Sequence, residues 1–368
     1  MSRKIPMVDV NAQTEALWPE LEKAALDVLR SGRFILGPNV EAFEREAASF
    51  LGVRHAVGVG AGTDALVLGL RALGIGPGDE VIVPSFTFFA TAEAVSLIGA
   101  TPVFADIEPN TFCLEPDSVA KAISLRTRAI IPVHLFGHPA EMDALGELAR
   151  RKGLAVLEDA AQGFGAVYRG RKIGGLGNAA AFSFFPSKNL GAFGEAGLIA
   201  TDDAAVADSV RRLRAHGSRE RYVHVEIGYN ARLDELQAAL LRVKLPHVAS
   251  WNDERRRVAR AYDAALSGVE GVTTPTVAPG CTHVFHQYTL RVPPGKRAAI
   301  QKALEEAGIS TQIYYPIPNH ALVMYAQGAP ALPATDAAAA SVLSLPIYPE
   351  LSDADVAEVA GKLRAALG

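Results

Sequence analysis

HAVGVGAGTDALVLGLRALG, residues 55–74, is the stretch that decides the fold. Its first six residues are a short apolar run of the kind that forms a buried strand, and residues 63–74 have the apolar spacing of a helix. The same succession returns where EVIVPSF (80–86) precedes TAEAVSLIG (91–99). Strands that alternate with helices are typical of βαβ units, so the sequence predicts a mainly parallel sheet.

Four more apolar runs extend this sheet: TPVFADI (101–107), AIIPVHLF (129–136), LAVLED (154–159) and AAAFSFF (179–185). They are nearly continuous rather than alternating, which is expected when helices cover both faces of a sheet. The predicted fold class is therefore α/β, with an open, doubly wound sheet. Ligands bind such sheets at the carboxyl ends of the strands, so the residues that follow each strand are candidates for a site.

A second, smaller domain is predicted after residue 245. Residues 204–262 are charged and helical in spacing, and Pro246 marks a break among them. The remainder combines one strand pattern with helix patterns, in FHQYTLRV (285–292), RAAIQKALEEAG (297–308) and DADVAEVAGKLRAAL (353–367). The 368 residues fit about two domains, here a large α/β domain at 1–245 and a smaller α+β domain at 246–368.

Composition narrows the class of protein. Thirty-six basic and 40 acidic residues give a net charge of −4, which argues against a nucleic-acid partner. Cys113 and Cys281 lie far apart and show no metal-ligand spacing, so neither a disulfide framework nor a zinc site is indicated. No secretory signal is recognisable, and the best apolar run has eight residues against the roughly 18 of a membrane span. We expect a cytoplasmic protein with no membrane contact.

Lys188 is the first candidate for chemistry, because it is the only charged residue between Asn178 and Gly194, whereas the other nine lysines lie in ordinary solvated contexts. Desolvation disfavours an ammonium group, lowers its pKa and frees the amine for Schiff-base formation. The alternative is a lysine whose long stem carries its charge out to solvent. Taken alone, the residue favours that alternative.

Three further features follow predicted strands. GAGTDAL (60–66) opens a helix whose first N–H groups could bind a phosphate, unless Thr63 or Asp64 merely caps it. Asp159, at the end of a buried strand, needs a partner such as a protonated pyridine nitrogen, unless it caps a following helix. Phe88 could stack on a planar ring, although an aromatic residue there is more often part of the core.

Together, a lysine, a phosphate cradle, an acid and an aromatic ring at strand ends are what pyridoxal phosphate requires. The sequence resembles the DegT/DnrJ/EryC1/StrS family of sugar aminotransferases, which have the fold-type I architecture. The motifs that carry the resemblance span the chain in order: FILGPNVEAFE, GTDAL, GDEVIVPSFTFFAT, EDAAQ, SFFPSKN, GYNARLDELQAA, YYPIP and SLPIYP. Their number and order make the resemblance far more specific than any one motif.

The resemblance implies a role for each matching residue. Lys188 would form the Schiff base with the cofactor and move protons, and Asp159 would keep the pyridine nitrogen protonated. The remaining cofactor contacts would be Gln162 to the phenolic oxygen, Phe88 by stacking, and Gly62, Thr63 and Ser183 to the phosphate. Asn230 matches a family position that reaches the phosphate of the neighbouring subunit, which implies a homodimer with shared active sites.

The resemblance also implies the substrates. Glutamate would donate the amino group, and a keto sugar on a nucleotide diphosphate would accept it, for amino-sugar or cell-surface polysaccharide synthesis. Arg232, Tyr314 and Tyr315 are the candidate sugar-nucleotide contacts, although Arg232 could instead pair with Asp234 or Glu235. An arginine suits a diphosphate or a carboxylate.

SFFPSKNLGAFG and GYNARLDELQAA look more like family members that aminate carbon 3 of a hexose than like those that aminate carbon 4. We therefore expect a 3-keto hexose on dTDP or UDP, with a 4-keto-6-deoxy sugar as the alternative. Two alternative functions of a different class are a pyridoxal-phosphate-dependent sugar dehydratase and a regulatory protein. The dehydratases carry histidine where Lys188 stands, and the net charge argues against DNA binding.

Overall fold

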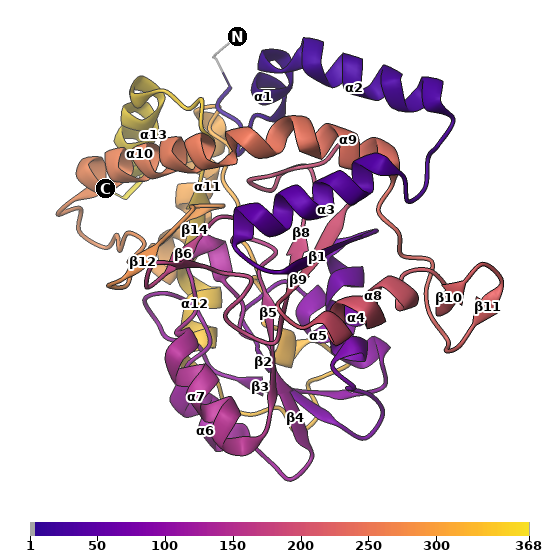
Figure 1. Cartoon of the computed structure of the whole chain (residues 1–368). Coiled ribbons are helices and arrows are strands. Elements are labelled where there is room, and N and C mark those ends of the chain that lie inside the picture. The colour runs from indigo at the N-terminus through magenta and orange to yellow at the C-terminus, as the bar shows by residue number, and fades with distance from the viewer. Residues whose placement is uncertain (1–3, 368) are drawn as a thin grey trace.

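The computed structural model describes residues 4–367, which form a central sheet, two helical layers and a C-terminal part (Figure 1). The helices are α1 (Val10–Ala16), α2 (Trp18–Ser31), α3 (Pro38–Leu51), α4 (Gly62–Ala72), α5 (Ala90–Leu97), α6 (Pro116–Ala122), α7 (Met142–Lys152), α8 (Ala204–Leu213), α9 (Glu235–Lys244), α10 (Val248–Leu266), α11 (Arg297–Glu306), α12 (Pro333–Ser341) and α13 (Asp353–Leu367). Within residues 4–367, none of the helices combines the length and the apolar character that crossing a bilayer would need.

The strands are β1 (His55–Val59), β2 (Glu80–Pro84), β3 (Thr101–Ala105), β4 (Thr127–Ile130), β5 (Ala155–Asp159), β6 (Val167–Tyr168), β7 (Arg171–Lys172), β8 (Ala179–Ser183), β9 (Gly197–Thr201), β10 (Ser218–Glu220), β11 (Val223–His224), β12 (Cys281–Thr282), β13 (Tyr288–Arg291) and β14 (Val342–Leu345). Seven of them form the central sheet in the order β1-β9-β8-β5-β4-β2-β3. Strands β3, β2, β4, β5 and β8 pair in parallel, and β9 runs antiparallel to both of its neighbours. The predicted, mainly parallel sheet is confirmed.

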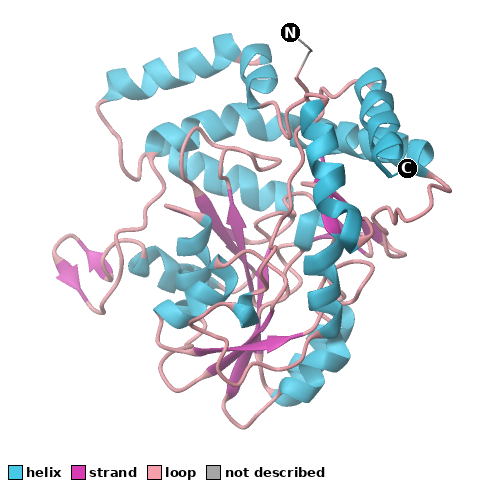
Figure 2. Ribbon diagram, turned by 180° about the vertical axis from the view of Figure 1, so that it is seen from behind, coloured by secondary structure: helices cyan, strands magenta, loops and turns pink. Residues whose placement is uncertain are grey.

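Helices cover both faces of this sheet, as Figures 1 and 2 show from opposite sides. Strand β8 illustrates why its sequence is apolar throughout. Ala180 and Phe182 face one core, which α3, α7 and α9 share, while Ala179 and Ala181 face the other, which α4, α5 and α8 share. The doubly wound arrangement leaves the carboxyl ends of the parallel strands as the place for a ligand.

The C-terminal part has a core of its own. Apolar residues of α10, α11, α13, β13 and β14 pack there, together with Ile5 from the N-terminal segment. The break predicted at Pro246 is confirmed, because α9 ends at Lys244 and a short 3₁₀ turn leads into α10. Helix α10 contributes Val248 to the large core and Val258 to the C-terminal one, so the limits 1–245 and 246–368 stay a prediction.

The N-terminal helices α1 to α3 were not predicted. Helix α3 begins where the carboxylate of Glu235, from α9, accepts hydrogen bonds from the N–H groups of Gly37, Asn39 and Val40. Glu235 is 1% exposed, so a contact across some 200 residues replaces the local cap that a sequence pattern would reveal. This contact brings the segment before α3 beside α9.

Candidate active site

A cavity of about 500 Å³ opens at the carboxyl ends of β5, β8 and β2. Its walls come from the start of α4, the loops after these strands and two C-terminal segments. The lining residues are Ala61, Gly62, Thr63, Leu66, Thr87, Phe88, Ala90, Val133, Asp159, Ala161, Gln162, Ser183, Phe185, Ser187, Lys188, Glu195, His286, Gln287, Tyr314 and Tyr315. The volume is within the range of small-molecule sites.

The start of α4 forms one end of the cavity. Ala61 occupies the N-cap position, and no side chain caps the helix, so the alternative in which Thr63 or Asp64 does so is wrong. A Cβ on Gly62 would lie 2.6 Å from the Cβ of Ser183, so only glycine allows this approach. The Ser183 hydroxyl accepts the N–H of Phe185, which leaves its proton free to donate. This end suits a phosphate.

Asp159 lies in the cavity wall at the end of β5 and is 5% exposed. Its Oδ2 accepts the hydroxyl of Thr91 at 2.8 Å, and its Oδ1 accepts the N–H of Ala161 at 3.2 Å. Burial raises the pKa of Asp159, and these hydrogen bonds and Lys188 oppose the rise. The α-helix that follows β5 in the chain is α8, so the helix-cap alternative for Asp159 is wrong.

Lys188 lies in the loop after β8 and lines the same cavity. Burial lowers the pKa of Lys188 to about 8, against the opposing charge of Asp159. The expectation that all other lysines are solvated was wrong for Lys244. That residue is 6% exposed, donates to the carbonyl oxygen of Gly191 at 2.5 Å and has its pKa lowered to about 8 by burial. Lys244 does not line the cavity, however.

Phe88 is 61% exposed and lines the cavity, so its alternative as a core residue is wrong. Gln162 is held on two sides. Its Oε1 accepts the N–H of Phe136 at 2.6 Å, and its Nε2 donates to the hydroxyl of Tyr315 at 2.8 Å. The second N–H of this amide remains for a ligand. Tyr314 and Tyr315 both line the cavity on the C-terminal side.

Asn230 and Arg232 do not line the cavity of their own chain. The Nη2 of Arg232 donates to the Oδ1 of Asn230 at 2.5 Å, which leaves the amide nitrogen of Asn230 as a donor. The alternative in which Arg232 pairs with Asp234 or Glu235 is wrong: no such ion pair occurs among residues 4–367, and Glu235 caps α3. The two side chains therefore form a hydrogen-bonded pair outside the cavity of their own chain.

Sequence reasoning gave no role to several residues of this neighbourhood, among them Thr87, Thr91 and His286. His286 lines the cavity, and burial together with the charge of Lys188 holds its pKa well below the usual value, so the imidazole is neutral at pH 7. Thr87 and Thr91 follow β2 within PSFTFFAT, the segment that also supplied Phe88. Nothing in the linear pattern distinguishes these threonines from others, because Asp159, to which they lead, lies 68 residues beyond Thr91 in the chain.

The DegT/DnrJ/EryC1/StrS aminotransferase family matches residues 17–364. The chain belongs to this family. Like the rest of the family, this aminotransferase depends on pyridoxal phosphate.

Two relatives and one solved structure describe what this aminotransferase is similar to. A UDP-N-acetyl-3-dehydro-α-D-glucosamine 3-aminotransferase of Acidithiobacillus ferrooxidans is 47% identical over 99% of this chain and 98% of its own. A pleiotropic regulatory protein of Geobacillus stearothermophilus is 48% identical over 95% of each chain. The crystal structure of DesV from S. venezuelae, in complex with a ketimine intermediate, superposes with a TM-score of 0.96, 48% identity and coverage of 99% and 98%.

The hydrogen-bond donors and acceptors that line the cavity of this aminotransferase fit pyridoxal phosphate. At one end are the uncapped N–H groups of α4 and a free hydroxyl proton, which suit the phosphate. At the other, Asp159 has only two hydrogen bonds for its four lone pairs, so it can accept a third from a ring nitrogen. The desolvated amine of Lys188 and the exposed face of Phe88 border the same space.

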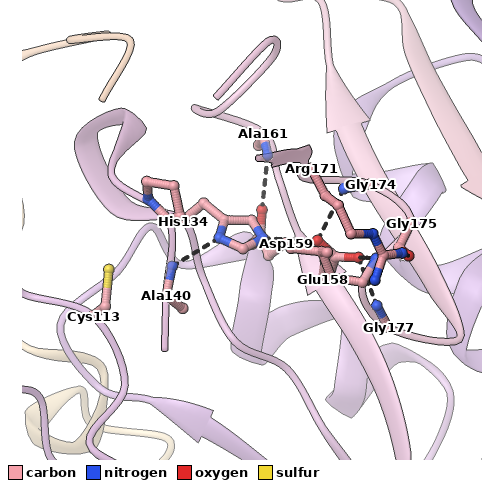
Figure 3. A network of polar contacts seen from close by, with 12 residues as sticks. Cys113, His134, Ala140, Glu158, Asp159, Ala161, Arg171, Gly174, Gly175 and Gly177 are labelled. Atoms are coloured by element: carbon pink, nitrogen blue, oxygen red, sulfur yellow. Dashed lines mark hydrogen bonds and ion pairs between the residues drawn. The ribbon is translucent and has the colours of Figure 1, made fainter. Parts of the chain in front are cut away.

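A second buried carboxylate holds the strand end that carries Asp159 (Figure 3). Glu158 points to the opposite face of β5, where it accepts N–H groups of Gly174, Leu176 and Gly177 and the Nε2 of His134 at 3.0 Å. Since the Nδ1 of His134 accepts the N–H of Ala140, the proton of a neutral ring is on Nε2. Burial raises the pKa of Glu158, but His134 and the N–H groups of Gly174 and Gly177 outweigh it, so the pKa is lowered.

We predict that Glu158→Gln lowers the free energy of unfolding by about 3 kcal/mol at neutral pH. The side-chain NH₂ of the glutamine would lie against an N–H donor and could not accept its hydrogen bond. A carboxyl group whose folded pKa is lowered stabilises the fold above its unfolded pKa and loses this effect as the pH falls through the folded one. The difference from wild type should therefore shrink in acid. Urea unfolding between neutral and acid pH measures it.

Glu358→Gln, an exposed change on α13, is the control and should stay within about 0.5 kcal/mol of wild type. A Glu158→Gln deficit that is equally large at neutral and acid pH would contradict the assignment of Glu158 as a buried anion.

Proposed function

We propose that this protein transfers the amino group of glutamate to the keto group of a sugar on a nucleotide diphosphate, with a 3-keto hexose on dTDP or UDP as the sugar. The observation that carries the proposal is one cavity that joins Lys188, whose burial lowers its pKa to about 8, with Asp159 and an uncapped helix start. The family and its relatives support the reaction class.

Bound pyridoxal phosphate would supply an aldehyde for the amino group and a ring that withdraws electrons from the substrate carbon. Lys188 would hold the cofactor through Nζ and then, as a free amine, carry a proton to and from that carbon. Its lowered pKa supports this role, since part of the amine is uncharged near neutral pH. Asp159 would keep the ring nitrogen protonated as its ionic hydrogen-bond partner.

The other contacts would fix the cofactor in place. Gly62, Thr63 and Ser183 would bind its phosphate, Phe88 would cover one face of its ring, and Gln162 would donate its remaining N–H to the phenolic oxygen. Each of them lines the cavity. Tyr314 and Tyr315, on the C-terminal side, would contact the sugar nucleotide.

We further propose a homodimer in which Asn230 and Arg232 complete the site of the partner subunit. Both residues lie outside their own cavity, and Arg232 orients the amide of Asn230. Exposed apolar side chains support this proposal, because a subunit interface would bury them. Tyr222 and Ile227, in and beside the projecting β10–β11 hairpin, are 81% and 85% exposed, and Phe34 is 49% exposed (Figure 1).

The choice of carbon 3 rests on the sequence motifs and on the Acidithiobacillus relative, whose name specifies a 3-amino transfer. A regulatory role, suggested by the name of the Geobacillus relative, would not require a desolvated lysine opposite a buried acid. We place the enzyme in the cytoplasm, where nucleotide sugars would supply amino-sugar or cell-surface polysaccharide synthesis.

Lys188→Ala should lose at least about 1000-fold in transamination, because both the covalent anchor and the proton carrier are removed. Borohydride reduction of the cofactor-loaded wild type, followed by peptide mass spectrometry, should find the cofactor on Lys188. Lys244 serves as an internal control, since its pKa is lowered equally outside the cavity. Cofactor found on Lys244, or on no lysine, would refute the role of Lys188.

The substrate is tested with glutamate and matched panels of 3-keto and 4-keto nucleotide sugars on dTDP, UDP and GDP. NMR locates the new amino group on the sugar ring. We expect amination at carbon 3. Amination confined to carbon 4 would overturn that choice and leave the aminotransferase activity standing, whereas loss of a sugar hydroxyl without amination would indicate a dehydratase.

The shared site is tested by mixing two inactive variants. Co-refolded Lys188→Ala and Arg232→Ala subunits should regain about one quarter of wild-type activity, because half of the dimers are hybrids with one intact site. A mixture of Lys188→Ala with Asp159→Ala, whose lesions fall in the same chain's cavity, should regain none. Equal recovery in both mixtures, or none in either, would contradict a site shared in this way.

A further inference from the structure

A chain of two hydroxyl groups leads to Asp159 from the segment that follows β2. Thr91 lies in the first turn of α5, is 1% exposed and places its Oγ1 at 2.8 Å from the Oδ2 of Asp159. The Oγ1 of Thr87, which is 3% exposed, lies 3.3 Å from that of Thr91. An ionised carboxylate can only accept, and a hydroxyl has one proton. The direction is therefore fixed: Thr87 donates to Thr91, and Thr91 donates to Asp159.

We propose that Thr91 is a positioning residue that, with Thr87 behind it, keeps the Asp159 carboxylate ionised and oriented so that its remaining lone pairs face the ring nitrogen of the cofactor. The proposal rests on the proposed role of Asp159 and goes beyond it. It assigns the maintenance of that charge to two uncharged residues, of which Thr87 lines the cavity and Thr91 lies behind its wall.

Asp159 needs such support because its surroundings contain little that stabilises a negative charge. Burial raises its pKa, whereas Thr91, Ala161, the charge of Lys188 and, least of all, His134 lower it. Lys188 loses its positive charge as a free amine. The other titratable groups that face Asp159 are His134 and Tyr315, and Glu158 adjoins it in the chain. The hydroxyl of Thr91 and the N–H of Ala161 are thus its permanent donors.

The hydroxyl chain is anchored to the substrate side of the site. The Nδ2 of Asn319 donates to the carbonyl oxygen of Thr87 at 3.4 Å. The backbone N–H of Asn319 donates to the carbonyl oxygen of Ser85 at 3.0 Å. The Ser85 hydroxyl in turn lies 2.7 Å from the Nδ1 of His320. Because Asn319 and His320 follow Tyr315 in the same segment, the position of Thr87 is fixed from the wall that would contact the sugar. Hydroxyl groups in such a series polarise one another.

The first test measures Asp159 without the cofactor. Infrared spectra of full-length apoprotein, taken as the difference from Asp159→Asn, follow the protonated carboxyl band with pH. Thr91→Val keeps the shape of the side chain and removes the donor. We expect it to raise the proton affinity of Asp159 about tenfold, or one pH unit. Thr91→Ser should restore the wild-type midpoint, and Thr87→Ala should give a smaller rise.

An unchanged titration midpoint of Asp159 in Thr91→Val would overturn the proposal. A midpoint that shifts as far in Thr91→Ser as in Thr91→Val would overturn it as well. Circular dichroism and thermal melting establish that each variant is folded. If Thr91→Val does not fold, Thr91→Ala takes its place in the same titration, with the same expected rise.

The second test measures the consequence in the loaded enzyme. With cofactor labelled with ¹⁵N in the ring, NMR reports how far the ring nitrogen is protonated. In Thr91→Val a more basic carboxylate should take a larger share of the proton, so the resonance moves toward neutral pyridine and kcat falls more than KM changes. Thr91→Ser should match wild type.

A wild-type ring nitrogen that is unprotonated and unaffected by Asp159→Asn would refute the proposed role of Asp159 itself. In another outcome, the ring nitrogen of the wild type is protonated and responds to Asp159→Asn, while Thr91→Val changes nothing in either test. That outcome would refute only the inference about Thr91.

Discussion

Two consecutive buried carboxylates at the end of β5 set the conditions that the surrounding structure must meet. Strand geometry points Glu158 and Asp159 to opposite faces of the sheet. Glu158 has four donors, from His134 and three backbone N–H groups, and its pKa is lowered. Asp159 has two donors, and its pKa is raised. One carboxylate has its hydrogen bonds satisfied within the protein, whereas the other keeps lone pairs free.

The remainder of the site follows from this difference. Lys188, opposite Asp159 in the same cavity, is desolvated enough that its amine is partly uncharged near neutral pH. The start of α4 offers N–H groups at the far end, and Gly62 is required there because Ser183 lies against it. A flat, phosphorylated ligand with a basic ring nitrogen and an aldehyde matches this set of groups. Pyridoxal phosphate, the cofactor of the family, is such a ligand.

The sequence indicated the order of strands and helices in the large domain because continuous apolar runs and helical spacing are local properties. It missed α1 to α3, and the start of α3 depends on Glu235, which lies some 200 residues away. It also treated Lys244 as solvated, since its burial against Gly191 involves a segment some 50 residues away. Thr63, Asp64, Phe88 and Arg232 each had a second interpretation that local pattern could not reject. The structure excludes that second interpretation for each of them.

By itself, the sequence determined the α/β class, the strand end that carries Asp159, the place of Lys188 after another strand, and the family, because these depend on the order of residues along the chain. Only the tertiary structure decided which side chains meet. It joined Thr87 and Thr91 to Asp159, paired Gln162 with Tyr315, and separated Asn230 and Arg232 from their own cavity. The physical reason is that a buried charge is set by the donors that packing brings to it, and those donors come from segments that the sequence keeps far apart.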